Sequence, residues 1–295
     1  MIVKNRKFQV QKATNMIFIL PAIVLNIVFF AIPLMKTVYM SLFDWKLLGD
    51  KKFIFLDNFV NAFRDETFVH SLVFTFKYAI FVTPCLFLLA FVLALLVKES
   101  FRGAGIFRTV YFAPVVISMT TCSMVWMWIY NDMYGILNYI LVKMGVISEN
   151  ISWMNKASTS LPAIVFMITW KMAGFTMLML VSAFQAVDGD VYEAASMDGA
   201  GKIKQFFKIT LPLIRSYVGL AMVISVIGSV LAFEQFSIMT KGGPSSSTLT
   251  AVHYIYNTSF KYFKFGYGSS LSLILLAILL ILSYFQFKVL SDPTV

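Results

Sequence analysis

The chain has 295 residues, of which 59% are hydrophobic and 13% charged, and its mean hydropathy is +0.82. In a typical soluble domain about a quarter of the residues are charged, so this composition excludes an ordinary soluble fold and favours an integral membrane protein. The net charge of +10 does not predict nucleic-acid binding, because no basic stripe with stacking aromatic residues lies outside the apolar runs and loop lysines commonly face anionic lipid.

Six apolar runs follow one another along the chain, and each is long enough for a spanning helix of about 20 residues. A basic head precedes the first run, which we expect to stay uncleaved because no clear cleavage site follows it. Cys85 and Cys122 lie inside the second and third runs and predict small buried hydrophobes, with no disulfide and no metal site. The predicted spans are residues 16–34, 71–97, 110–130, 161–187, 213–233 and 268–287. The predicted fold class is therefore an all-α integral membrane protein with six transmembrane helices.

Six spans place both termini on one side of the membrane, and the basic head favours the cytoplasm for that side. We expect residues 1–15 to form a cytoplasmic N-terminus and residues 289–295 a cytoplasmic tail. Residues 16–69 then hold the first helix with an outer loop, and residues 70–288 hold helices 2 to 6. In the fifth run, Ala221, Ser225 and Ser229 form a face of small residues, which favours helix packing within one subunit over a dimer seam.

A polar segment, residues 188–212, separates the fourth and fifth runs and contains "EAASMDGAGKIKQFFKITLP". Asp188 and Asp190 precede a run of good helix formers, where carboxylates suit a helix N-terminus. Gly199, within "DGAG", predicts a turn. A second helix is predicted from Lys202, and Pro212 suits the first turn of the fifth span.

Two interpretations of this polar segment compete. Its second helix places phenylalanines opposite lysines, which is typical of a helix that lies on the membrane surface. The small residues and the glycine instead suit a compact knob that enters a groove on another protein. The knob would contain Ala194, Ala195, Gly199 and Ala200, with Glu193 and Asp198 at its ends.

The segment resembles the EAA loop of permease subunits in bacterial ATP-binding-cassette importers. The family pattern is matched by Glu193-Ala194-Ala195, Asp198-Gly199-Ala200, Phe206, Ile209 and Pro212. One departure is Ser216, where many members have a second proline. Further stretches resemble the branch that imports sugars and polyols, among them "LPAIVLNIVFFAIPLMKTVYMSLFDW" and "FRTVYFAPVVIS". The short tail after Phe287 is similar to the maltose-F or glycerol-phosphate-A type of subunit.

The resemblance implies a permease subunit of the plasma membrane of a bacterium or archaeon, with an EAA coupling helix that docks on a cytoplasmic ATPase. The residues expected to couple the two proteins are Glu193, Ala194, Ala195, Met197, Asp198, Gly199, Ala200 and Phe206. The chain has no phosphate-loop motif, so we expect a non-catalytic chain without a cofactor and ATP with magnesium on the ATPase. The implied partners are two ATPase subunits, a G-type permease, an extracytoplasmic solute-binding protein, a sugar and membrane lipid.

Lys171 is a charge deep inside the fourth run, where insertion costs roughly 2.5 kcal/mol or more. It is either a donor to a sugar hydroxyl or an anionic group, or a structural partner of a carboxylate or carbonyl. Trp126, Trp128 and Trp170 either offer flat faces to a sugar ring or serve packing. Ser225, Ser229 and Glu234 are further candidates for the substrate path, with packing and loop capping as their alternatives.

Two other functions remain open at this point. A permease of the same architecture for glycerol phosphate or another polyol derivative would carry the same loop. A secondary transporter or channel that works alone would not need a segment that docks on an ATPase, so the polar loop argues against it. No spacing of residues predicts a metal site or a catalytic triad.

Overall fold

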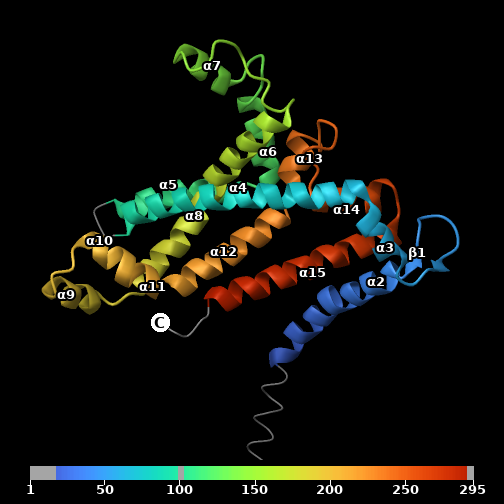
Figure 1. The fold of residues 1–295 in the computed structure, drawn as a ribbon, viewed down its shortest axis with the longest axis horizontal. Coiled ribbons are helices and arrows are strands. Elements are labelled where there is room, and N and C mark those ends of the chain that lie inside the picture. The colour runs from blue at the N-terminus through green and yellow to red at the C-terminus, as the bar shows by residue number, and fades with distance from the viewer. Residues whose placement is uncertain (1–17, 99–102, 291–295) are drawn as a thin grey trace, which may run out of the picture. The chain divides into compact units, whose positions relative to one another are not determined.

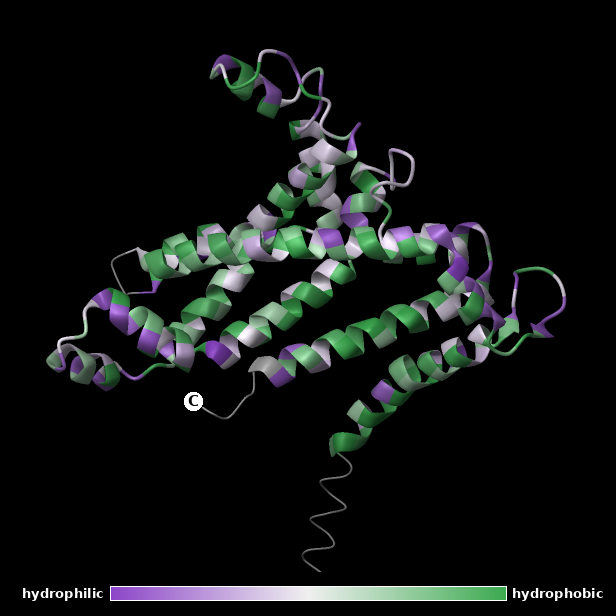
Figure 2. Ribbon diagram, viewed as in Figure 1, coloured by the Kyte–Doolittle hydropathy of each residue, from purple (hydrophilic) through white to green (hydrophobic). Residues whose placement is uncertain are grey.

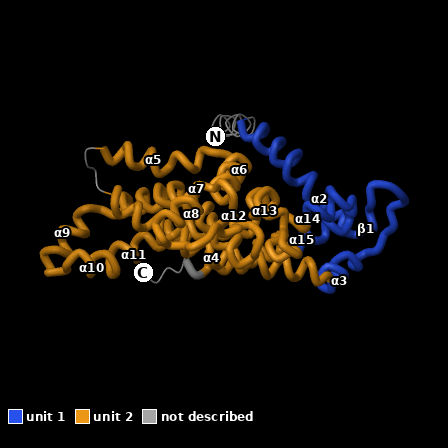
Figure 3. Tube along the Cα trace, turned by 90° about the horizontal axis from the view of Figure 1, so that it is seen from above, with its two compact units in different colours: residues 1–64, 255–274 blue, residues 65–254, 275–295 orange. Residues whose placement is uncertain are grey.

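The computed structural model describes residues 18–98 and 103–290. The predicted basic head and the end of the predicted tail lie outside the described residues, as does the stretch 99–102 of the predicted inner loop. The chain divides into two compact units (Figure 3). Unit 1 contains residues 1–64 and 255–274, and unit 2 contains residues 65–254 and 275–295.

The elements follow the chain as labelled in Figure 1. The first helix, Phe18–Ser41, includes η1 (Ile27–Ala31) and α2 (Ile32–Ser41). The next elements are β1 (Phe43–Asp44), β2 (Lys52–Phe53), α3 (Asp57–Arg64), α4 (Glu66–Val97), α5 (Ala104–Val116), α6 (Met119–Ile129), α7 (Ile136–Lys143) and α8 (Ala157–Gln185). The last are α9 (Gly189–Met197), α10 (Lys202–Gln205), η2 (Phe206–Thr210), α11 (Leu211–Leu213), α12 (Arg215–Val230), α13 (Glu234–Met239), α14 (Ala251–Tyr256), η3 (Asn257–Lys261) and α15 (Phe265–Leu290).

Unit 1 joins the first helix to the start of α15 through short backbone contacts. β1 and β2 form a small antiparallel hairpin, and the Nδ2 of the buried Asn58 donates to the carbonyls of Ser41 (2.8 Å) and Phe43 (3.0 Å). The amide of Gly266 donates to the carbonyl of Trp45 (3.0 Å). A side chain on Gly266 would meet the carbonyl of Phe43, so this position requires glycine.

Unit 2 is built on α4 and α8, which pack along each other, with α12 against both. Asp65 caps the start of α4, since its carboxylate accepts from the amides of Thr67 (3.0 Å) and Phe68 (3.2 Å). One core cluster gathers large side chains such as Tyr78, Met167 and Phe236. The other core cluster includes Ala90, Ala94, Met177, Leu180 and Ile214. It combines small and large residues, which is typical of helices whose association in lipid is driven by close packing and not by the exclusion of water.

Five helices among the described residues are long and apolar enough to cross a membrane: Phe18–Ser41, Glu66–Val97, Ala157–Gln185, Arg215–Met239 and Phe265–Lys288. Their apolar character is visible along α4, α12 and α15 in Figure 2, whereas hydrophilic residues gather at α10 and around α7. They correspond to five of the six predicted spans. The predicted boundaries shift by several residues, because caps such as Asp65 and not the apolar runs set the helix ends.

The third predicted span is wrong as a continuous helix. α5 and α6 meet at 94° across a break of two residues, so they form either a broken span or a re-entrant loop. Ile117 (φ −67°, ψ 135°) and Ser118 (φ −60°, ψ 149°) are extended, and the Ser118 hydroxyl caps α6 by accepting from the amide of Thr121 (3.1 Å). Pro114 weakens the last turn of α5, because proline has no amide hydrogen to donate to the carbonyl four residues earlier.

Candidate functional site

The polar segment folds into the two predicted helical pieces with a glycine turn between them. Asp188 caps α9, and the turn after α9 is closed by the amide of Gly199 donating to the carbonyl of Ser196 (3.1 Å). The amide of Ala200 donates to the carbonyl of Ala195 (2.9 Å). Gly199 has φ +73°, which a residue with a side chain adopts only at a cost of roughly 1–2 kcal/mol. The predicted glycine break is therefore confirmed.

Side-chain hydrogen bonds tie α9 to the segment that follows it. The hydroxyls of Tyr192 and Thr210 lie 2.9 Å apart, and Thr210 is buried at the end of η2. The Nε2 of Gln205 donates to the Ser196 hydroxyl and to the carbonyl of Ala200, both at 2.9 Å. η2 is followed directly by α11 and then by α12, the fifth span. Sequence reasoning missed Tyr192, Gln205 and Thr210, which are polar residues outside the family pattern.

The expected coupling residues differ in their exposure. Met197 is 90% exposed, and Glu193, Ala194, Asp198 and Gly199 are also exposed. Ala195 is only 9% exposed because it faces its own chain. Ala200 and Phe206 are half-buried. The predicted knob therefore needs a correction for Ala195, which packs against its own chain and is not on the exposed surface. α9 exposes the large apolar side chain of Met197 instead.

The second helical piece departs from the predicted amphipathic helix. After the four residues of α10, the chain widens into the π-helical turn η2, which inserts a residue into the helical repeat. Phe206 then turns toward the helices of unit 2, while Ile203 and Phe207 stay exposed. Ile203, Phe206 and Phe207 therefore do not form one continuous apolar face, because Phe206 faces the interior and the other two lie on the surface.

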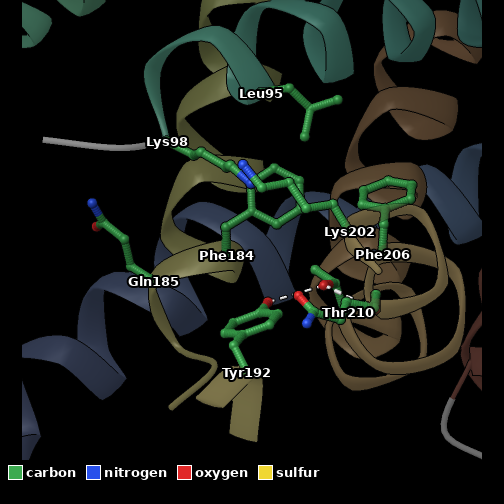
Figure 4. Close-up of a pocket in the computed structure, with 9 residues that line it drawn as sticks. Leu95, Lys98, Phe184, Gln185, Tyr192, Lys202, Phe206 and Thr210 are labelled. Carbon is green, nitrogen blue, oxygen red and sulfur yellow. Dashed lines mark hydrogen bonds between the residues drawn. The ribbon is translucent and has the colours of Figure 1, made fainter. Parts of the chain in front are cut away.

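A cavity of about 380 Å³, here called the loop cavity, lies between this segment and the ends of α4 and α8 (Figure 4). Its lining residues are Leu95, Lys98, Phe184, Gln185, Tyr192, Lys202, Gln205, Phe206 and Thr210. The cavity thus combines two lysines, hydroxyl and amide groups, and an apolar part. Neither lysine belongs to the residues that the sequence predicted as functional.

Lys171 lies where α8 passes the bend between α5 and α6. Its side chain is 3% exposed, and its ammonium group donates to the carbonyls of Pro114 (3.1 Å), Val115 (3.3 Å) and Ile117. These carbonyls end α5, where the helix leaves acceptors without an internal partner and carries partial negative charge. The contacts favour the structural alternative for Lys171, with backbone carbonyls as its partners.

Gly174 lies one turn beyond Lys171 and brings α8 against the backbone of α5. A Cβ atom there would meet the carbonyl oxygen of Tyr111 and would lie 2.7 Å from its carbonyl carbon and 2.8 Å from the Cα of Phe112. Glycine is therefore required at this crossing. Lys171 and Gly174 together fix the C-terminal half of α5 on α8.

The other candidates for the substrate path are partly brought together. The rings of Trp126 and Trp170 lie 5.5 Å apart in an edge-to-face arrangement, with Trp126 buried in the core and Trp170 40% exposed. Ser229 is buried, and its hydroxyl donates to the carbonyl of Ser225 (2.8 Å). Trp128 and Glu234 are exposed. Trp126 and Ser229 therefore serve packing in this conformation, whereas Trp170 and Glu234 remain accessible.

A second cavity, of about 670 Å³, lies along α4 and α8 and contains none of the predicted residues of the substrate path. Phe74, Phe81 and Phe166 line it together with Lys77. The hydroxyl of Thr169, which also lines it, has no hydrogen-bond partner within the described part of the chain. Cys85 lines this cavity and is exposed, so the prediction that it is buried is wrong, whereas Cys122 is buried as predicted.

Comparison with known proteins agrees with a membrane domain of a transporter. Residues 59–295 match the family "Binding-protein-dependent transport system inner membrane component". The probable ABC transporter permease protein YurN of Bacillus subtilis is 33% identical over 92% of this chain and 94% of its own. The lactose transport system permease protein LacF of Rhizobium radiobacter is 30% identical over 92% of both chains.

A solved structure has the same fold. It is a bacterial ABC transporter involved in the import of the acidic polysaccharide alginate, with a TM-score of 0.84 at 19% identity, over 99% of this chain and 100% of that one. The chain thus belongs to the family of inner membrane components of binding-protein-dependent transport systems. It is a multi-pass membrane protein and an ABC transporter permease, as the resemblance of its EAA segment predicted.

Proposed function

We propose that this permease forms the translocation path for a sugar or oligosaccharide and that α9 docks on a cytoplasmic ATPase. The observation that carries the proposal is the exposed surface of α9 around Met197, held by side-chain hydrogen bonds to a segment that leads directly into α12. A rigid, exposed element joined to a spanning helix suits the transmission of motion. ATP-driven closure of two ATPases would pull two such elements together and tilt the helices between two states.

The name of LacF, a lactose transport permease with 30% identity, supports a sugar as the substrate class. Exposure of Trp170 and Glu234 in unit 2 supports their place along the path. A glycerol phosphate or another polyol derivative is the alternative substrate class. Binding of candidate solutes to the partner receptor, measured by calorimetry, discriminates between the two classes.

The proposed partners are a second permease of the G-type, two ATPase subunits that hold ATP and magnesium, and an extracytoplasmic solute-binding protein. In this arrangement the chain carries no catalytic residues and no cofactor, and both termini lie in the cytoplasm. A complex purified with two copies of this chain and no second permease would overturn the proposed heterodimer. Uptake driven by an ion gradient through the lone chain would support a stand-alone transporter instead.

The coupling role is tested with two glycines that lie two residues apart. Gly199 has φ +73°, whereas Gly201 has φ −66°, and nothing lies within 4 Å of a Cβ built on either. Gly199→Val should therefore distort the turn, while Gly201→Val, the matched control, should leave it intact. Both variants are reconstituted with their partners in vesicles, and uptake and ATP hydrolysis are measured side by side.

We expect Gly199→Val to insert and assemble and to keep basal hydrolysis, because the ATPase sites lie on other chains. Uptake and substrate-stimulated hydrolysis should fall together by about tenfold, in line with roughly 1–2 kcal/mol of strain at the turn. Transport at the wild-type rate by an assembled Gly199→Val complex would assign the segment to the membrane surface instead.

A further inference from the structure

The loop cavity lies at the level where two spanning helices end. Lys98 directly follows the last residue of α4, and Gln185 is the last residue of α8. Both helices belong to the set that is long and apolar enough to cross a membrane. The cavity is therefore at the height of the lipid headgroups, whichever side of the membrane this end of the bundle faces.

Among the described residues, the charged groups that line the loop cavity are all lysines. Lys98 and Lys202 extend into it from α4 and α10 (Figure 4), and its lining contains no aspartate or glutamate from the described part of the chain. The carbonyl of Val97, which ends α4, is already occupied by Arg108, whose Nη2 donates to it at 2.6 Å. Arg108, and neither of the two lysines, therefore caps this carbonyl. Such a basic site between membrane helices attracts an anion.

The apolar part of the lining lies on the membrane side of the lysines. Leu95 is one helical turn before Lys98 on α4, and Phe184 precedes the last residue of α8. Phe206 from η2 adds an aromatic ring. A ligand that fits this arrangement of basic and apolar residues has an anionic group on the water side of the cavity and a hydrocarbon chain on its membrane side. A soluble phosphate would satisfy the lysines and leave the apolar residues uncovered.

We propose that the loop cavity binds the phosphate-bearing headgroup of an anionic phospholipid, with Lys98 and Lys202 on the phosphate and the start of an acyl chain against Leu95 and Phe184. The bound lipid would connect the end of α4 to α10 and so hold the segment that carries α9 against the spanning helices. The site does not depend on the identity of the transported solute or on an ATPase.

The test is native mass spectrometry of the full-length chain in detergent, with dioleoyl phosphatidylglycerol or dioleoyl phosphatidylcholine added. The test variant is Lys98→Gln with Lys202→Gln. The matched control is Lys204→Gln with Lys208→Gln, which removes the same charge from residues nearby that do not line the cavity. A third variant, Lys98→Arg with Lys202→Arg, keeps the charge.

We expect wild type to retain phosphatidylglycerol in preference to phosphatidylcholine. The test variant should bind it more weakly by about thirtyfold, because both lysines near the phosphate are lost, while the control and the arginine variant retain it. Equal loss in the test variant and its control would overturn the proposal in favour of diffuse surface attraction. Displacement of the lipid by millimolar inorganic phosphate would overturn it in favour of a soluble anion. Equal retention of both lipids by wild type would exclude an anion site.

Discussion

The bend between α5 and α6 and the segment from α9 to η2 both interrupt the spanning helices, but they are held in different ways. At the bend, the acceptors are backbone carbonyls inside the bundle, and the partner is the buried ammonium of Lys171. At the α9 segment, most side chains are exposed, and side-chain hydrogen bonds such as that between Tyr192 and Thr210 hold the turn. Lipid offers no replacement for a lost partner, whereas water does. Changes at the bend should therefore damage folding, and changes at the segment should damage coupling.

The largest effect is expected at Gly174, where α8 meets the backbone of α5. Gly174→Ala places a Cβ into the carbonyl group of Tyr111. Because the backbone cannot move aside as a flexible side chain can, we expect the free energy of unfolding to fall by more than the usual 1–3 kcal/mol for overpacking. The measurement is the yield of monodisperse protein after size-exclusion chromatography. Gly228→Ala is the control, since nothing lies within 4 Å of its added Cβ and alanine favours a helix. A normal yield of Gly174→Ala would mean that the crossing of α5 and α8 is looser than described.

A smaller effect at the same bend is expected for Lys171→Met. The substitution removes the ammonium donor from the carbonyls of Val115 and Ile117 and one of the two donors of the Pro114 carbonyl, which destabilises the chain by about 2–3 kcal/mol. Thermal unfolding of the purified protein should occur several degrees lower. Lys77→Met, which removes a lysine that lines the second cavity on α4, should leave the unfolding temperature unchanged. Unaltered stability with lost uptake in Lys171→Met would return this lysine to the substrate path.

At the α9 segment, Glu193→Lys tests the exposed surface and leaves the fold alone. Glu193 is exposed, so the expected unfolding temperature is that of wild type. Charge reversal at the rim of a docking surface disfavours the correct partner, and uptake by the reconstituted complex should fall by about fivefold. Glu149→Lys, the same reversal in an exposed loop after α7, serves as the control. Equal uptake by the two variants would show that α9 does not contact the ATPase through this carboxylate.

The smallest effect is expected for Tyr192→Phe, which removes the hydroxyl that contacts Thr210. One hydrogen bond contributes about 0.5–1.5 kcal/mol, and Gln205 still bonds to Ser196 on α9 and to Ala200 in the turn that follows it. The amount of substrate moved per ATP hydrolysed should fall by about twofold while assembly is unchanged. Tyr217→Phe, on the exposed side of α12, is the control. An unchanged ratio would mean that the bonds of Gln205 are sufficient to hold α9.

Much of this protein was determined by sequence alone, because the controlling physics is local. Apolar runs of sufficient length predicted the spanning helices, since lipid accepts a continuous helix with satisfied backbone groups. Asp188 and Gly199 predicted the start and the end of α9, because a cap and a left-handed residue act within one turn. The residues of the EAA pattern, Glu193 to Pro212, led to the family that the comparisons then showed.

Tertiary structure decided the rest, because it depends on which residues far apart in the chain meet. The sequence around Ile117 is apolar and predicts a continuous span. The break is stabilised by a contact between the carbonyl of Ile117 and Lys171, which lies 54 residues further along the chain. Ala195 and Met197 belong to the same short motif, yet packing buries one and exposes the other. Lys98 and Lys202 are separated in sequence by five helices, α5 to α9, and share one cavity. Periodicity and caps cannot predict such pairings, because the contacts arise only when the helices are assembled.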